Sequence, residues 1–293
     1  MRFLRWLLFF SLLPASALAQ SRIDCNALKS HILRETVHYC VMLPTGYDAP
    51  KASTLRYPVL YFLHGLGGNE QELFKMGGWD LVQDLRREHK ITDFLIVTPE
   101  AKASFYVNSA DGKVRYSDFF LHEFIPFIEG QYRIRRDRSV RAVSGISMGG
   151  YGALRFAFAN PDLFSAVSAE SAALMPASPH DLDAMQRSDS FFKEIMAPVF
   201  GDPINGAHWQ ENDPFALAQK NRSAIRRLAI YFNCGRDDQY QFEVGAERLD
   251  RQLDSEGIRH VFHLYPGDHS GSYFLAHLAE LMEFHSQHFP PAK

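Results

Sequence analysis

A serine held between glycines is the feature of this chain most able to do chemistry. Residues 145–149 read G-I-S-M-G, and residues 139–144 before them are mostly small or β-branched. Residues 150–157 after them have the apolar spacing of a helix. A strand, a sharp turn and a helix in this order predict a nucleophile elbow, in which small neighbours leave room for a strained serine. Ser147 is therefore the candidate nucleophile, with the amide of Met148 beside it at a helix start.

The same pentapeptide without catalytic partners would be an ordinary glycine-rich turn, so the partners matter. A serine hydroxyl needs a base to take its proton and a carboxylate to orient that base. Hydrolases with this elbow carry the three groups in the order Ser, Asp or Glu, His, on loops that follow strands. Asp237 and Asp238 directly follow an apolar strand expected at 227–233, and His269 follows one expected at 260–264.

His269 is the candidate base because the other histidines after the two aspartates lie in the last expected strand or helix. Its loop position and its place in the chain order are those that the mechanism requires. The residues alone leave open which aspartate orients it. They also leave open that Asp237 and Asp238 form only a solvated turn or a helix cap.

A glycine-rich loop supplies the remaining catalytic element. Residues 63–69, L-H-G-L-G-G-N, follow the apolar run 57–63 and can turn backbone amides toward a developing oxyanion. A phosphate-binding loop would end in Lys-Ser or Lys-Thr, which this segment lacks. His64 precedes the nucleophile in the chain, so we expect it to brace this loop by hydrogen bonds rather than to act as the base.

The elements that position these loops alternate between strands and helices. Near-continuous apolar runs, as at 57–63 and 94–99, predict strands buried on both faces. Further strands are expected at 36–43, 139–144, 164–169, 227–233 and 260–264, and helices at 80–89, 117–131, 150–157, 243–253 and 274–288. This alternation predicts one α/β domain over residues 20–293, with a mostly parallel sheet and helices on both faces.

One segment, 173–221, breaks the alternation because its prolines and aromatic residues follow no clear period. It comes after the elbow and between two expected strands. An insertion at this position can form a lid-like cover over the carboxyl edge of the sheet, where such folds bind ligands. A helical excursion packed on the core is the alternative, and the sequence does not separate the two.

The first residues have the pattern of a secretory signal peptide at 1–19. Arg2 and Arg5 precede an apolar run at 6–13, and A-L-A at 17–19 is a small-x-small cleavage signal. The apolar run is too short for a spanning helix, so a retained membrane anchor is the weaker alternative. We therefore expect a secreted or periplasmic protein, cleaved near Ala19, without stable membrane insertion.

Composition and charge exclude some classes of function. The chain has 293 residues and a net charge of −3 with both signs mixed throughout, which does not suggest a nucleic-acid partner. In an exported protein, Cys25 and Cys40 are candidates for a disulfide that ties the N-terminal segment to the first expected strand. Cys234 ends an apolar strand and is expected to be a buried free thiol.

Four segments together resemble the esterase D-like esterases. They are H-G-L-G-G at 64–68, G-I-S-M-G-G-Y-G-A-L at 145–154, C-G-R-D-D at 234–238 and G-D-H-S at 267–270. This group includes S-formylglutathione hydrolases, feruloyl and acetylxylan esterases, and mycolyltransferases. The resemblance covers residues from about 37 to about 288 and implies a serine esterase with the α/β-hydrolase fold.

The resemblance also implies roles for individual residues. Ser147 would be the nucleophile, His269 the base and Asp238 the catalytic carboxylate, while Asp237 would shape the turn. The oxyanion hole would be formed by the amides of Leu66 and Met148, and a loop at 105–108 would border the site. Candidate substrate-binding residues around these loops are His64, Tyr106, Asn108 and Tyr240.

Two departures favour one branch of this group. The chain has H-G-L-G-G where S-formylglutathione hydrolases usually have H-G-L-T-C, and it carries an export signal where those enzymes are usually cytosolic. Both favour an exported carboxylic-ester hydrolase that acts on a small-molecule or polysaccharide-linked ester and needs no metal or organic cofactor. An acyltransferase using the same acyl-enzyme, a thioesterase, a peptidase and a non-catalytic binding protein remain alternatives.

Overall fold

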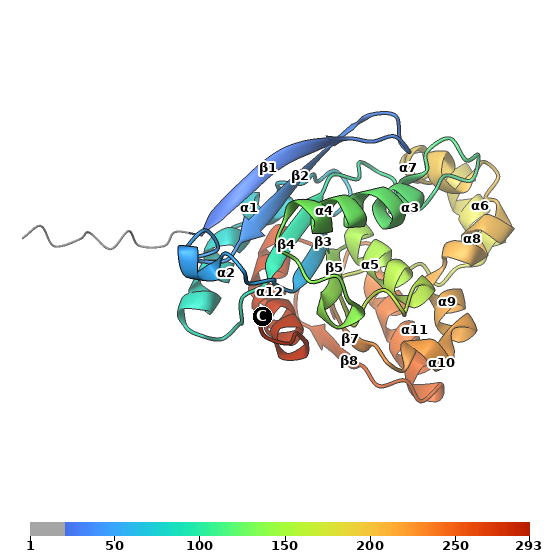
Figure 1. Ribbon diagram of the computed structural model, residues 1–293. Coiled ribbons are helices and arrows are strands. Elements are labelled where there is room, and N and C mark those ends of the chain that lie inside the picture. The colour runs from blue at the N-terminus through green and yellow to red at the C-terminus, as the bar shows by residue number, and fades with distance from the viewer. Residues whose placement is uncertain (1–20) are drawn as a thin grey trace, which may run out of the picture.

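The computed structural model describes residues 21–293 (Figure 1). The signal peptide predicted for residues 1–19 lies outside the described residues, so it stays a prediction. The described residues form a layered α/β structure, in which a twisted sheet runs between helices on its two faces (Figure 1). The sheet has eight strands in the order β1-β2-β4-β3-β5-β6-β7-β8.

The strands are β1 (Arg22–Lys29), β2 (Thr36–Leu43), β3 (Val59–Leu63), β4 (Leu95–Pro99), β5 (Arg141–Ile146), β6 (Ala166–Glu170), β7 (Ala229–Gly235) and β8 (Val261–Tyr265). β1 pairs antiparallel with β2, and β2 pairs antiparallel with β4. All the other neighbours in the sheet are parallel. The expected α/β fold with a mostly parallel sheet is confirmed.

The α-helices are α1 (Glu72–Lys75), α2 (Gly78–Arg87), α3 (Tyr116–Phe119), α4 (Ile125–Gln131), α5 (Met148–Ala159), α6 (Pro179–Ser188), α7 (Ser190–Phe200), α8 (Gly206–Asn212), α9 (Pro214–Lys220), α10 (Arg222–Ile225), α11 (Phe242–Ser255) and α12 (Gly271–His288). Two short 3₁₀ turns, η1 (Pro50–Ala52) and η3 (Arg138–Val140), and one π-helical turn, η2 (Phe120–Phe124), complete the described elements.

The core has two halves because successive strand side chains point to opposite faces of the sheet. In β3, Val59, Tyr61 and Leu63 join the larger apolar cluster, to which α4, α5, α9 and α11 contribute. Leu60 and Phe62 join the smaller cluster, to which α1, α2 and α12 contribute. All five residues are buried, which explains why β3 reads as a continuous apolar run rather than an alternating one.

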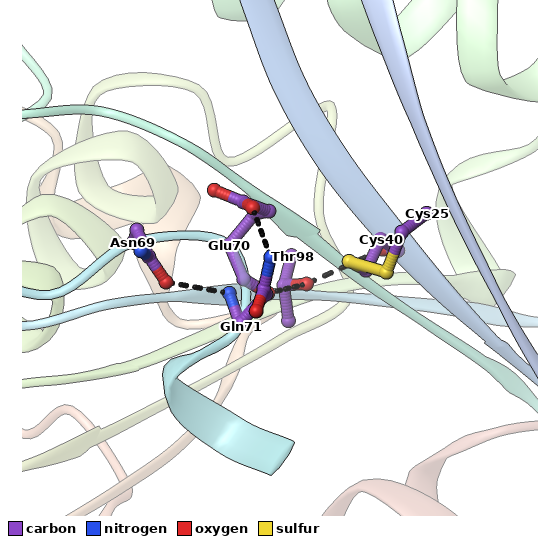
Figure 2. Close-up of a disulfide and its surroundings, with 6 residues drawn as sticks. All are labelled: Cys25, Cys40, Asn69, Glu70, Gln71 and Thr98. Atoms are coloured by element: carbon purple, nitrogen blue, oxygen red, sulfur yellow. Dashed lines mark hydrogen bonds between the residues drawn. A yellow bond between two sulfur atoms is a disulfide. The ribbon is translucent and has the colours of Figure 1, made fainter. Parts of the chain in front are cut away.

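An edge strand that the sequence did not predict precedes this core. β1 pairs with β2 along its whole length and places Cys25 opposite Cys40. The two cysteines form a disulfide, which Figure 2 shows beside Thr98 of β4. The Thr98 hydroxyl donates to the carbonyl of Glu70 at 2.6 Å, connecting this part of the sheet to the segment that follows the glycine-rich loop. Cys234 is free and buried, as expected.

The aperiodic segment 173–221 folds into four helices, α6 to α9. Phe200, Trp209 and Phe215 from this segment are buried in the larger cluster. These three aromatic residues lie in α7, α8 and α9, one in each helix, whereas Phe191 at the start of α7 is 62% exposed. A lid-like role of this segment over a ligand stays a prediction.

Candidate active site

The nucleophile elbow forms between β5 and α5 as the sequence predicts. Ser147 has φ 53° and ψ −119°, a conformation that is strained for any residue with a side chain. A Cβ atom on Gly149 would lie 2.0 Å from the Leu63 carbonyl oxygen, and one on Gly145 would lie 2.4 Å from the Gly149 carbonyl carbon. Both glycines are therefore required by the close approach of β3, β5 and the start of α5.

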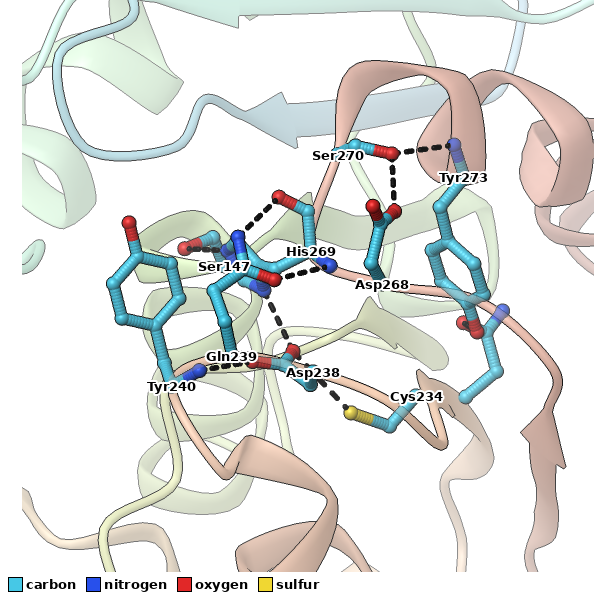
Figure 3. Close-up of polar contacts among 10 residues, drawn as sticks. Ser147, Cys234, Asp238, Gln239, Tyr240, Asp268, His269, Ser270 and Tyr273 are labelled. Carbon is cyan, nitrogen blue, oxygen red and sulfur yellow. Dashed lines mark hydrogen bonds and ion pairs between the residues drawn. The ribbon is translucent and has the colours of Figure 1, made fainter.

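Ser147, His269 and Asp238 lie in one hydrogen-bonded line (Figure 3). The Ser147 Oγ lies 2.8 Å from His269 Nε2, and His269 Nδ1 lies 2.7 Å from Asp238 Oδ2. The carboxylate can only accept, so Nδ1 carries the proton and Nε2 is free to accept from Ser147. The side chains of His269 and Asp238 are 8% and 0% exposed, so water competes little for either contact.

The structure brings Asp238, and not Asp237, to the histidine. Asp238 Oδ1 accepts from the Tyr240 amide at 2.9 Å, and its Oδ2 receives the Cys234 thiol at 3.7 Å as well as the imidazole. Asp237 is exposed, and its backbone amide donates to the Gly267 carbonyl at 2.9 Å. The neighbouring aspartates thus have different surroundings: one faces the imidazole and the other shapes the turn.

The two candidate oxyanion residues come from different segments: Met148 directly follows Ser147, and Leu66 follows Gly65, where an added Cβ atom would lie 3.6 Å from Ser147 Cβ. Met148 is the first residue of α5, so its amide lies at the positive end of the helix dipole. Leu66 lies at the exposed tip of the loop after β3. Within residues 21–293, neither backbone amide donates an intramolecular hydrogen bond. Both amides are therefore available to a substrate oxygen.

Glu72 was not singled out in the sequence, yet it holds the glycine-rich loop. Its Oε2 accepts from the Gly65 amide at 2.7 Å. A Cβ atom on Gly68 would lie 2.6 Å from Glu72 Oε1, so the loop wraps closely around the carboxylate. An acidic residue soon after a glycine loop is a weak signal, and only the folded loop reveals this contact.

His64 and Tyr106 lie near the loop as expected, but both side chains are buried, and their role in substrate binding stays a prediction. Their exposed fractions are 2% and 0%. His64 Nε2 accepts from the Ala101 amide at 2.8 Å, its Nδ1 lies 2.7 Å from the Gly65 carbonyl, and burial lowers its pKa. The Tyr106 hydroxyl donates to the His64 carbonyl at 3.0 Å. Both side chains brace the oxyanion loop, as we expected for His64.

Asn108 and Tyr240 have different surroundings. Asn108 Oδ1 accepts from the Asp118 amide at 3.1 Å, so this side chain holds the start of α3. The Tyr240 ring is 57% exposed, stands nearly perpendicular to the His269 ring at 5.0 Å, and stacks on Phe242. Of these two residues, Tyr240 is the one that presents an open aromatic face beside the base.

A second serine–histidine hydrogen bond lies inside the core. Ser168 Oγ is 2.8 Å from His285 Nε2 and 2.7 Å from Ser144 Oγ, and both Ser168 and His285 are 0% exposed. His285 Nδ1 has no hydrogen-bond partner among residues 21–293, so no carboxylate orients this ring. Burial lowers the pKa of His285 to about 3. A substrate cannot reach this pair, which serves packing between β5, β6 and α12.

No group of three or more His, Cys, Asp or Glu side chains in the described part of the chain could hold a metal ion. No helix between residues 21 and 293 combines the length and apolar character needed to cross a membrane.

Comparison with known proteins decides the family. Residues 30–285 match the profile of the family described as "Putative esterase". The chain belongs to this esterase family. The esterase is 30% identical over 234 residues to an acetyl esterase of Caldicellulosiruptor saccharolyticus, a match covering 78% of this chain and 83% of that protein. The esterase D-like resemblance seen in the sequence is confirmed.

Two solved structures have the same fold as the esterase. A ferulic acid esterase has a TM-score of 0.77 at 26% identity, with 92% of this chain and 99% of that one covered. A fluorophosphonate-binding serine hydrolase of Staphylococcus aureus has a TM-score of 0.75 at 21% identity, covering 91% and 98%. Together with the family match, these relatives identify a serine hydrolase of carboxylic esters with the α/β-hydrolase fold.

Proposed function

We propose that the esterase hydrolyses its ester in two steps through an acyl-enzyme on Ser147, with His269 as the base and Asp238 as the orienting carboxylate. The observation that carries this proposal is the continuous line of contacts, 2.7 Å from Asp238 to His269 and 2.8 Å from His269 to Ser147. The three residues also have the chain order, and the positions after strands, of α/β-hydrolase triads.

The geometry supports the following sequence of events. Ser147 Oγ attacks the ester carbonyl while His269 Nε2 takes its proton, and Asp238 stabilises the resulting imidazolium. The amides of Leu66 and Met148 donate to the tetrahedral oxyanion. The imidazolium then returns the proton to the leaving alcohol. Water, activated by the same histidine, releases the acid and restores Ser147.

We further propose an ester with a small or aromatic acyl group as the substrate. The names of the relatives, acetyl esterase and ferulic acid esterase, support this class. Within this chain, the exposed ring of Tyr240 beside His269 offers a face on which an aromatic group can stack. Tyr240→Ala should raise the KM for methyl ferulate more than for p-nitrophenyl acetate. An equal change for both esters would contradict stacking on this ring.

We also propose that the esterase works outside the cytoplasm. The Cys25–Cys40 disulfide supports this, because structural disulfides persist in oxidising compartments. Expression of the full chain with a C-terminal tag, followed by cell fractionation and N-terminal sequencing, tests the proposal. A chain retained in the cytoplasm with residues 1–19 intact would contradict it.

The central experiment measures hydrolysis of p-nitrophenyl acetate by the parent, Ser147→Ala and Ser168→Ala. Loss of the nucleophile should lower kcat by roughly 10⁴-fold or more. Ser168→Ala is the matched control, because it removes the buried serine–histidine contact and should leave kcat close to that of the parent. Undiminished hydrolysis by a folded Ser147→Ala variant would overturn the assignment. Product analysis with added sugar alcohols separates hydrolysis from acyl transfer.

A further inference from the structure

The side chain of Gln239 pairs with the backbone of the catalytic histidine. Its Oε1 accepts from the His269 amide at 3.0 Å, and its Nε2 donates to the His269 carbonyl at 3.3 Å (Figure 3). A primary amide carries the same donor and acceptor as a peptide group. Gln239 therefore satisfies both main-chain groups of one residue, as a neighbouring strand would.

This pairing continues a ladder that the main chain cannot continue. The register of β7 and β8 ends with Gly235 opposite Tyr265. Beyond the strands, the Arg236 amide donates to the Tyr265 carbonyl at 2.7 Å and the Asp237 amide to the Gly267 carbonyl at 2.9 Å. The chain then turns at Asp238, whose carbonyl accepts from the Gln241 amide at 3.0 Å and whose carboxylate contacts the imidazole. Among residues 21–293, no backbone group of this turn bonds to the His269 backbone. The Gln239 side chain instead makes the two hydrogen bonds with the His269 backbone.

The position of Gln239 next to Asp238 gives the pairing a consequence for the site. One segment of chain holds the His269 ring through the carboxylate and the His269 backbone through the amide. On its other side, His269 is followed by Ser270, the N-cap of α12. With both its backbone and Nδ1 fixed, the imidazole has little freedom to turn away from Ser147.

We propose that Gln239 is a positioning residue that holds His269 in line with Ser147 and acts on the rate of the chemical step. This inference rests on the proposed function of Ser147 and His269. Gln239 is exposed, and water competes for its hydrogen bonds, so their contribution to overall stability is small. Alignment of a base is far more sensitive, because a displacement of about 1 Å can cost roughly 10²-fold in rate.

The test compares Gln239→Met with Gln252→Met. The first removes both contacts with His269 at nearly constant side-chain length. Gln252 of α11 is the matched control. Its Nε2 also donates to a backbone carbonyl, that of Phe215 in α9, at 2.9 Å. We expect Gln239→Met to lower kcat by roughly 10–100-fold. Its KM and melting temperature should stay close to those of the parent, and Gln252→Met should leave kcat unchanged.

A second measurement is the rate at which a fluorophosphonate probe labels Ser147. This rate depends on the reactivity of the Ser147 hydroxyl and not on binding of the ester substrate. It should fall in Gln239→Met by the same factor as kcat. Gln239→Glu provides a further variant if Gln239→Met does not fold. The carboxylate that this variant introduces cannot donate to the His269 carbonyl, so the probe should also label Ser147 more slowly than in the parent.

The outcomes separate this inference from the proposed function. If the parent itself is not labelled at Ser147, the proposed function fails. If the parent is labelled and folded Gln239 variants are labelled as fast and keep kcat, only the positioning role is overturned. A fall in kcat that Gln252→Met reproduces would also overturn it, because the loss would then reflect general stability.

Discussion

At the scale of single residues, the catalytic line depends on side-chain direction as well as on residue type. Asp237 and Asp238 have the same carboxylate and adjacent positions, yet only Asp238 contacts the imidazole, at 2.7 Å. Its two oxygens also receive the Tyr240 amide and the Cys234 thiol. The proposed triad carboxylate is thus distinguished by three donors that converge on one side chain.

This pair of aspartates offers an internal comparison. Asp238→Asn should lower kcat by roughly 10⁴-fold, because an amide donor at this position favours the wrong imidazole tautomer. Asp237→Asn leaves the tautomer unaffected and should change kcat little. The measurement is kcat for p-nitrophenyl acetate, with circular dichroism to establish that both variants fold. Similar losses in the two variants would contradict the assignment of Asp238.

The tight packing around Gly149 predicts that a methyl group added at this position destabilises the fold. An added Cβ would lie 2.0 Å from the Leu63 carbonyl oxygen, and a backbone atom in the central strand cannot move aside cheaply. Gly149→Ala should therefore lower the free energy of unfolding by about 1–3 kcal/mol or more. Urea denaturation measures the change. In Gly271→Ala, the control, the new Cβ meets nothing within 4 Å, and a comparable loss there would refute this explanation.

At the scale of elements, β6 carries a buried carboxyl directly beside the elbow. The Glu170 carbonyl accepts from the Ser147 amide at 2.9 Å, while both its carboxyl oxygens are buried and without a hydrogen-bond partner among residues 21–293. Burial, reinforced by the charge of Glu280, raises the pKa of the Glu170 carboxyl well above its ordinary value of 4.5. The folded strand therefore keeps a proton that the unfolded chain releases.

This difference predicts a dependence of stability on pH. The contribution of the protonated Glu170 is fully present below the unfolded-state pKa of 4.5 and is lost as the pH rises toward the raised folded-state pKa. Glu170→Gln removes the titration, so its stability relative to the parent should increase from pH 5 to pH 8. Urea unfolding of both proteins at the two pH values measures the difference. A constant difference would show that Glu170 keeps an ordinary pKa.

At the scale of the whole molecule, the disulfide and the proposed catalytic groups lie in different parts of the sheet. Cys25 and Cys40 join the edge strand β1 to its neighbour β2, whereas Ser147, Asp238 and His269 follow β5, β7 and β8. The sheet order places β1 and β8 at opposite edges. Stability supplied by the disulfide is therefore separable from catalysis.

The double variant Cys25→Ser/Cys40→Ser tests this separation. The disulfide spans 15 residues, and closing a loop of that length contributes up to about 3 kcal/mol in the chain-entropy treatment. The variant should have a lower melting temperature but an unchanged kcat/KM at temperatures where it is folded. Scanning calorimetry and initial rates measure the two quantities. A fall in kcat/KM in the folded variant would mean that the hairpin supports the site directly.

The sequence by itself determined the fold class and predicted the proposed nucleophile and its proposed base. The elbow is a local structure, so its glycines mark Ser147 without knowledge of the rest of the chain. His269 could be predicted because the carboxyl ends of parallel strands meet at one edge of the sheet. A residue on a loop that follows such a strand therefore lies near the site. The alternation of strands and helices predicts such a sheet for the same local reasons.

Only the tertiary structure decided which neighbours converge. The family resemblance points to Asp238, but the residues themselves do not show its contact with His269, which spans 31 residues. The pairing of the Gln239 side chain with the His269 backbone is likewise visible only in the folded chain. The contacts of Glu72 and Tyr106 with the glycine-rich loop depend on how one segment packs against another. Such contacts join segments that no period or motif connects, because they are set by packing rather than by local conformation.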